Sequence, residues 1–109
     1  MSLEQANPDV AVVGGGPIGL ASAWRAAQRG LRVCVLDAGD PGAWHVAAGM
    51  LAPVAEANFG EDALLDLSLR AAAGFAAYCE ELADASGADP GLRPTGTLVV
   101  ARDLSLIHI

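Results

Sequence analysis

Three glycines at fixed spacing, Gly14, Gly16 and Gly19, follow an apolar run near the start of the chain, and Asp37 closes the next apolar run. Glycines at this spacing can serve a bound diphosphate. The first permits a tight turn, the second lets a pyrophosphate approach the main chain, and the third lets a helix pack closely on a strand. The helix that follows presents free N–H groups and a partial positive charge. A carboxylate at Asp37 can accept hydrogen bonds from both ribose hydroxyls of an adenosine.

The residues around these glycines predict the strand, helix and strand that would position them. Residues 9–13 are a short β-branched run, residues 17–29 carry apolar side chains at intervals of three and four after a proline, and residues 31–36 are a second apolar run. Gly30 suits the end of the helix. The strand, the glycine turn, the helix and the acidic residue after the second strand all match the dinucleotide-binding pattern. The sequence therefore favours dinucleotide binding over a glycine-rich turn in an unrelated α/β fold. No arginine directly follows Asp37, which disfavours a nucleotide with a 2′-phosphate.

The second half of the chain predicts one long helix and one strand. Residues 38–60 show no clean period, residues 62–86 fit an amphipathic helix that Gly87 ends, and residues 95–101 fit a third strand. The predicted apolar stripe of the helix consists of Leu64, Leu67, Ala71, Phe75, Tyr78 and Leu82.

Composition narrows the class of protein. The chain has 109 residues, a length that suits one small domain, and a formal net charge of −7, which argues against nucleic acid and anionic membrane as partners. No apolar run approaches the length of a membrane span, and the first residues lack the pattern of a signal peptide. We expect Cys34 and Cys79 to be reduced, buried or half-buried thiols of a cytoplasmic protein. We expect no metal site, and we interpret His45 as a loop residue and assign His108 no role.

The βαβ unit by itself does not distinguish FAD from NAD. The segment "GAWHVAAGMLAP", residues 42–53, replaces the second crossover helix that an NAD dehydrogenase would have. Its small residues leave backbone N–H groups accessible, so it could return to the cofactor and line a flat apolar ring. A plain surface loop or the start of an ordinary helix fits the composition equally well.

The run "VVGGGPIGLASAWRAAQRGLRVCVLDAG" followed by "AAGMLAPVAEA" resembles the FAD-dependent amine oxidases of the D-amino acid oxidase superfamily, above all its bacterial members that oxidise glycine. The resemblance extends from Asp9 to Asp103. It implies an α/β fold in which a Rossmann-like FAD-binding βαβ unit forms the N-terminal part of a larger two-domain flavoprotein. Residues 1–109 would then be a partial FAD-binding domain without its substrate domain and C-terminal half, and residues 104–109 depart from the family pattern.

The same resemblance assigns roles to the cofactor-binding residues. The turn from Gly14 to Gly19 holds the FAD pyrophosphate, Asp37 meets the adenosine ribose, and Met50 lies close to the flavin ring. Many relatives carry glutamate at the position of Asp37. The full set implied by the resemblance is Gly14, Gly15, Gly16, Pro17, Ile18, Gly19, Asp37, Ala38, Ala43, Trp44, Ala47, Ala48, Gly49 and Met50. Relatives often carry hydroxyl residues at the positions of Ala43 and Trp44, so we expect any contact there to come from backbone.

The implied reaction of the parent protein is oxidative deamination of glycine or a similar small amine, giving an imine or oxo acid, ammonia and hydrogen peroxide. The imine could pass to thiazole synthesis. The resemblance leaves open whether the parent protein is a homo-oligomer. No catalytic residue is expected in this part of the chain. Two alternatives stay open: another D-amino acid or sarcosine oxidase, and a dinucleotide-binding fragment without catalysis. Parallel strands normally need cover on both faces, so we expect the isolated chain to be poorly packed and inactive.

Overall fold

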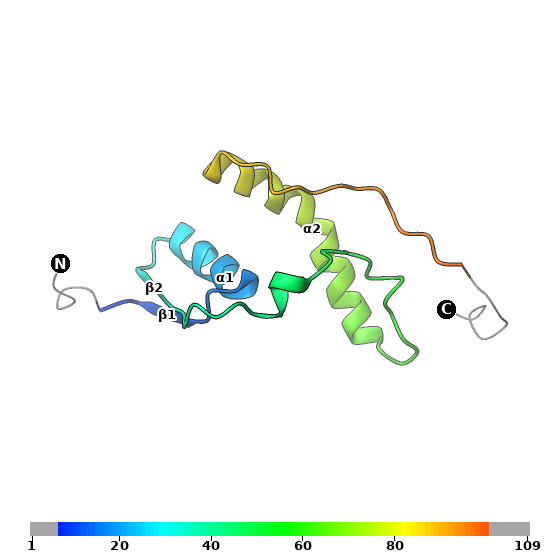
Figure 1. The fold of residues 1–109 in the computed structure, drawn as a ribbon, viewed down its shortest axis with the longest axis horizontal. Coiled ribbons are helices and arrows are strands. Elements are labelled where there is room, and N and C mark those ends of the chain that lie inside the picture. Colours follow the sequence, from blue (N-terminus) through cyan, green and yellow to red (C-terminus); the bar gives the residue numbers. More distant parts are fainter. Residues whose placement is uncertain (1–6, 101–109) are drawn as a thin grey trace. The chain divides into compact units, whose positions relative to one another are not determined.

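The computed structural model describes residues 7–100 of the chain. They divide after Ala48 into two compact units, which we describe separately. The helices and strands follow one another in the order β1 (Val10–Val13), α1 (Pro17–Gln28), β2 (Val33–Leu36), the 3-10 helix η2 (Ala43–Val46) and α2 (Asp62–Ser86) (Figure 1).

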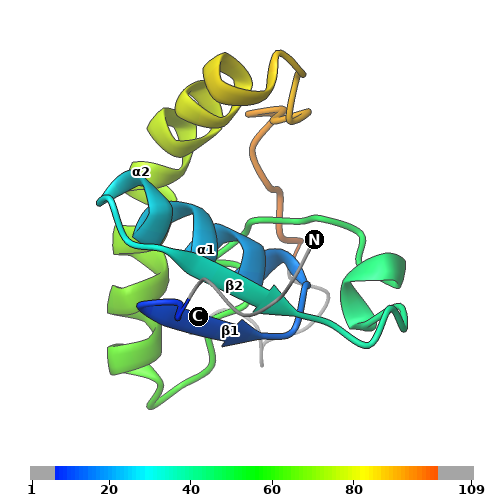
Figure 2. The same cartoon turned by 90° about the vertical axis from the view of Figure 1, so that its left-hand side faces the viewer.

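The first unit is the predicted βαβ arrangement. Strands β1 and β2 pair in parallel, with Val10 opposite Val33 and Val13 opposite Leu36. Helix α1 connects the two strands and lies against one face of the pair (Figure 2). Each element begins and ends within two residues of its predicted bounds, because the apolar periods and the glycine and proline signals around them agree.

Proline and glycine set the ends of α1. Pro17 occupies the first helical position, where its missing N–H removes no helical hydrogen bond. At the other end, Arg29 is the capping residue and Gly30 follows it with a φ of +82°. The Gly30 N–H donates to the Ala27 carbonyl oxygen at 2.9 Å. This left-handed residue ends the helix and turns the chain back toward β2.

The second unit contains α2, whose bounds agree with the prediction. Gly87 ends the helix with a φ of +70°, and its N–H donates to the Ala83 carbonyl oxygen at 2.8 Å. The predicted apolar stripe is wrong in the first turns, where Leu64 and Leu67 are 55% and 57% exposed while Leu65 is half-buried. Leucine and alanine occupy so many neighbouring positions there that the apolar arc is wide and does not fix which side is covered.

The predicted strand over residues 95–101 is also wrong where the structure describes it. Residues 95–100 adopt no regular secondary structure, and Leu98 is 88% exposed. A β-branched run becomes a strand only when another strand pairs with its backbone, and none within residues 7–100 does so here. Ala101, Asp103, His108 and the predicted atypical tail at 104–109 lie outside the described residues.

The buried core is small. Among the described residues, only Ala23, Ala52 and Cys79 have buried apolar side chains, whereas Val13 is 85% exposed at the end of β1. Two strands with one helix leave the other face of the sheet and its outer edges uncovered, as the sequence suggested for so short a parallel sheet. Cys34 is half-buried and Cys79 buried, and both are free thiols. Whether the isolated chain is poorly packed in solution stays a prediction.

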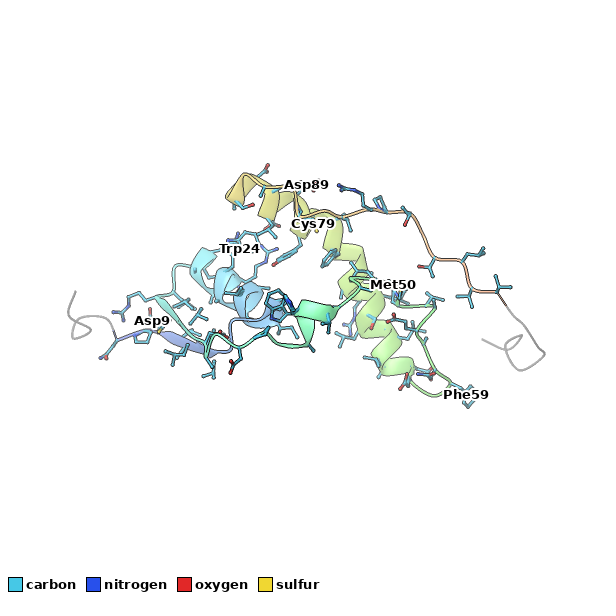
Figure 3. All side chains as sticks on the ribbon, viewed as in Figure 1. Asp9, Trp24, Met50, Phe59, Cys79 and Asp89 are labelled. Atoms are coloured by element: carbon cyan, nitrogen blue, oxygen red, sulfur yellow. The ribbon has the colours of Figure 1, made fainter. Side chains whose placement is uncertain are left out.

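An ion pair joins the beginnings of the two strands. Arg32 donates to the Asp9 carboxylate through Nε at 3.1 Å, through its second guanidinium nitrogen at 2.9 Å and through its backbone N–H at 2.8 Å. Asp9 lies at the start of β1 in Figure 3. These bonds favour the charged carboxylate and so lower the pKa of Asp9 from 3.8 to about 2. The side-chain bonds from Arg32 have the largest effect, followed by the backbone bond. The pair therefore helps to set the register of β1 against β2 at the end opposite the glycines.

We expect carbon-detected NMR titration of the full-length protein to give an Asp9 pKa near 2, and Arg32→Gln to return it toward 3.8. The folded carboxyl has the lower pKa, so its contribution to stability is present above pH 3.8 and is lost as the pH falls toward about 2. Asp89, whose pKa is lowered by the Gly91 N–H and by Arg93, is the control and should not respond to Arg32→Gln. An Asp9 pKa that is the same in both proteins would contradict the ion pair.

Candidate functional site

The glycine turn begins where β1 ends. Gly14 has a φ of +103°, a conformation that side-chain-bearing residues rarely adopt. Its N–H donates to the Leu36 carbonyl oxygen at 2.8 Å, which extends the parallel ladder by one bond before the chain turns away. The first glycine of the motif therefore has the conformational role that the spacing predicted.

Gly19 lies where the helix comes closest to the strand end. A Cβ atom on Gly19 would overlap the Gly14 carbonyl oxygen and would lie 3.1 Å from the Gly14 carbonyl carbon and 3.3 Å from a Val12 methyl group. The first two of these atoms are backbone and cannot move aside without moving the strand. The third glycine therefore permits the close packing of α1 on β1, again as its place in the motif predicted.

Gly15 holds the carboxylate of Asp37. The Gly15 N–H donates to one Asp37 carboxylate oxygen, and the Gly39 N–H donates to the other at 2.7 Å. A Cβ on Gly15 would lie 2.9 Å from that first oxygen, so a side chain here would displace the carboxylate of Asp37. The sequence placed Gly15 in the turn but gave it no separate role, because residues 22 apart in the chain show no sign of contact. The one sequence signal for this role of Gly15 is its place in a run of three consecutive glycines, residues 14–16.

Both hydrogen bonds stabilise the charged form of Asp37. The bond from Gly15, followed by the bond from Gly39, lowers the pKa of this carboxyl below its usual value of 3.8. Each carboxylate oxygen has two lone pairs and uses one of them here, so both oxygens can still accept a bond from a ligand hydroxyl. Asp37 thus presents a fixed, negatively charged acceptor beside the turn.

The start of α1 offers unpaired donors. Ile18 and Gly19 lie in the first turn, where N–H groups have no acceptor within the helix, and Pro17 has no N–H. Gly16 is the N-cap, with no side-chain capping bond, and no acidic residue lies in the first turn. These main-chain donors and the helix dipole therefore remain available to an anion.

One side chain from η2 approaches the turn. A Cβ on Gly16 would lie 3.5 Å from Cδ1 and 3.9 Å from Nε1 of Trp44, and no other residue beyond its chain neighbours would come within 4 Å. Gly16 therefore borders an open space that only the Trp44 indole flanks. The His45 ring packs edge-on against that indole, with ring centroids 5.8 Å apart.

The structure brings together only part of the predicted site. Contacts in the first unit join Gly19 to Gly14, Gly15 to Asp37 and Gly16 to Trp44. Pro17 and Ile18 form the first turn of α1, and the remaining predicted residues of this unit lie exposed, namely Ala38, Ala43, Ala47 and Ala48. Gly49 and Met50 begin the second unit, and Met50 is 70% exposed (Figure 3). The predicted contacts of Ala48, Gly49 and Met50 with a flavin ring stay predictions.

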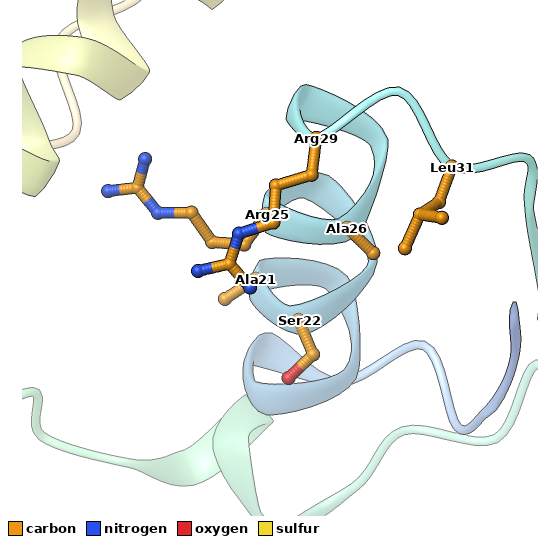
Figure 4. A pocket seen from close by; sticks show the side chains of 6 residues that line it. All are labelled: Ala21, Ser22, Arg25, Ala26, Arg29 and Leu31. Carbon is orange, nitrogen blue, oxygen red and sulfur yellow. The ribbon is translucent and has the colours of Figure 1, made fainter.

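A shallow depression on the flank of α1 contains none of the predicted site residues. Its lining consists of Ala21, Ser22, Arg25, Ala26, Arg29 and Leu31 (Figure 4). In the described part of the chain, no cluster of three or more His, Cys, Asp or Glu side chains could hold a metal ion. No helix between residues 7 and 100 is long and apolar enough to cross a membrane.

Comparison with known proteins identifies the relatives of this chain. A family model described as FAD dependent oxidoreductase, DAO, matches residues 9–108. The chain is 40% identical over 91 residues to the bifunctional protein ThiO/ThiG of Trichormus variabilis, covering 83% of this chain and 14% of that protein. It is 40% identical over 95 residues to the glycine oxidase of Geobacillus kaustophilus, covering 85% of this chain and 25% of that enzyme. The chain thus spans a quarter or less of these relatives. No solved structure matches it.

We expect Gly19→Ala to destabilise the protein by about 3 kcal/mol, because the new methyl group would overlap the backbone of Gly14. Gly74→Ala is the matched control, because Gly74 lies within α2 with nothing near its missing Cβ. There the substitution should stabilise by about 1 kcal/mol through helix propensity. Denaturant unfolding of both variants measures the difference, and equal effects of the two would contradict the close helix–strand packing.

Proposed function

Because the chain belongs to the DAO family of FAD-dependent oxidoreductases, we propose that its glycine turn binds the diphosphate of FAD. The observation that carries this proposal is the geometry of the turn, where four bare positions, Gly14, Gly15, Gly16 and Gly19, lie at the start of α1 beside the fixed carboxylate of Asp37. A Cβ at Gly15 or Gly19 would collide with its neighbours, and a Cβ at Gly16 would enter the open space in front of the helix. The residues present therefore fit an adenine dinucleotide.

The proposed binding mode follows the donors and acceptors of the turn. The N–H groups of Gly16, Ile18 and Gly19 donate to the diphosphate, with the dipole of α1 behind them. The carboxylate of Asp37 accepts bonds from the adenosine ribose hydroxyls through its remaining lone pairs. Residues Ala47–Met50, with Ala38 and Ala43, complete the proposed cofactor contacts.

For the parent protein we propose oxidative deamination of glycine or a similar small amine. The names of the relatives support this substrate, since one is a glycine oxidase and another is a bifunctional ThiO/ThiG protein. Bound FAD supplies the redox chemistry, oxidation of a carbon–nitrogen bond with dioxygen as the final electron acceptor. The residues of this chain bind and orient the cofactor, and we assign none of them a catalytic role.

The proposal includes the place of this chain in its parent. Residues 1–109 would form a partial FAD-binding domain of a larger two-domain flavoprotein, consistent with a span of 14% and 25% of the two relatives. The ThiO/ThiG name further supports delivery of the product to thiazole synthesis. Two free thiols, Cys34 and Cys79, suit a reducing cytoplasm.

A second candidate is a chain that by itself binds a dinucleotide and catalyses nothing. It is favoured by the contacts of the glycine turn with Asp37 and Trp44, which all lie within the first unit. Titration of the chain with FAD, NAD and AMP distinguishes the candidates. Tight NAD binding without FAD binding would favour a dehydrogenase or a sensor.

We expect Gly16→Ser to abolish FAD retention in the full-length protein without unfolding it. Gly16 is the helix N-cap with φ −73° and ψ 176°, a conformation and position that serine favours. The melting temperature of the apoprotein should therefore stay equal or rise, while the serine side chain enters the space proposed for the diphosphate. FAD content is read from visible absorbance after purification. A variant that purifies with full FAD occupancy would show that the diphosphate binds elsewhere.

We also expect the FAD-loaded full-length protein to release hydrogen peroxide with glycine. A peroxidase-coupled assay with glycine, sarcosine, D-alanine and D-proline at equal concentrations compares the substrates by kcat/KM. Glycine should rank first or equal first. If glycine gives no peroxide while a bulkier D-amino acid does, the narrower assignment is wrong and another oxidase of the family is indicated.

A further inference from the structure

The side chain of Trp44 lies beside the open space in front of Gly16. The atoms of Trp44 nearest to a Cβ on Gly16 are Cδ1 at 3.5 Å and Nε1 at 3.9 Å. These two atoms form the pyrrole edge of the indole, which carries its N–H group. The donor edge of the ring, and not its hydrocarbon edge, therefore borders the position where the motif brings a diphosphate to the main chain.

Three neighbours set the position of the ring. A Cβ on Gly42 would lie 3.1 Å from Cδ1 of Trp44, so the absence of a side chain at Gly42 leaves room for the indole to fold back toward the turn. Gly16 borders the ring on the side of the turn, and His45 packs edge-on against it. Trp44 is 53% exposed, so one part of the ring is packed and the other is open to solvent.

The charges around the turn make such a neutral donor useful. The chain contains no lysine, and no arginine occurs between Arg32 and Arg70, while Asp37 and Asp40 are acidic. The basic side chains of the first unit lie away from Gly16, since Arg25 and Arg29 are at the C-terminal end of α1 and Arg32 pairs with Asp9 where the strands begin. A diphosphate at the turn would therefore be held by dipolar N–H groups and not by basic side chains of the first unit.

We propose that the indole N–H of Trp44 donates a hydrogen bond to the diphosphate of the bound dinucleotide, beside the backbone of Gly16. This inference rests on the proposed function and deepens it. The sequence suggested that residues 43 and 44 could contact the cofactor only through backbone, because neither has a hydroxyl group. The structure points instead to a side-chain donor of a different chemical type, on a short helix that the sequence pattern did not reveal.

The test is calorimetric titration of the full-length apoprotein and its variants with FAD, ADP and AMP. Trp44→Phe keeps an aromatic ring but removes the N–H, and we expect it to weaken FAD and ADP binding by roughly tenfold, the usual effect of one bond to a charged acceptor. AMP has a single phosphate next to the ribose and should lose less. Trp24→Phe, which changes the other tryptophan, on α1 and outside the turn, is the matched control and should bind all three ligands normally.

The possible results separate this inference from the proposed function. If FAD and ADP bind Trp44→Phe as tightly as the unaltered protein, the indole N–H is not a diphosphate donor. Tighter binding would also overturn the inference, because it would mean that the ring obstructs the space. Loss of FAD affinity without loss of ADP affinity would place Trp44 at the flavin half. If the unaltered protein binds neither FAD nor ADP, both the inference and the proposed function fail.

Discussion

The first unit depends on one close approach, that of α1 to the end of β1. Gly19 allows the first turn of the helix to lie directly against the carbonyl group of Gly14, where any side chain would overlap backbone. This contact fixes the direction of α1, and so the direction in which its free N–H groups point. The other glycines of the turn are needed for different reasons: Gly14 adopts a φ of +103°, and a Cβ on Gly15 would press on the carboxylate of Asp37. The geometry of the proposed diphosphate site follows from this packing constraint.

The two strands are held in register at both ends by carboxylates. Asp9 bonds to Arg32 where the strands begin, and Asp37 bonds to the Gly15 N–H where they end. A slip of one residue between parallel strands would turn every side chain to the opposite face. It would also move Asp37 away from the turn. The same carboxylate thus contributes to the fold and supplies the acceptor proposed for the ribose, which links the stability of the turn to the binding of its ligand.

The exposure of the apolar faces is consistent with the comparisons. Val13 at the end of β1 and Leu98 in the last described segment are more than four-fifths exposed. The relatives that share this sequence are at least four times longer than the aligned part. Sheets of parallel strands in α/β proteins are normally covered on both faces and extended by further strands. The family and the exposure together support the proposal that the chain is one part of a larger FAD-binding domain.

The sequence alone determined the elements whose signals are local. The apolar period, Pro17 and Gly30 predicted α1, and the glycine spacing with Asp37 predicted the turn. The family resemblance needed the run at residues 47–53 as well. The sequence alone could not determine contacts between residues that are far apart in the chain. The bond from Gly15 to Asp37 and the approach of Trp44 to Gly16 depend on how β2 and η2 return to the turn, and no local pattern encodes that. The run at 95–100 fits a strand by composition, but pairing is a property of two segments, so only the tertiary structure could decide that it stays irregular.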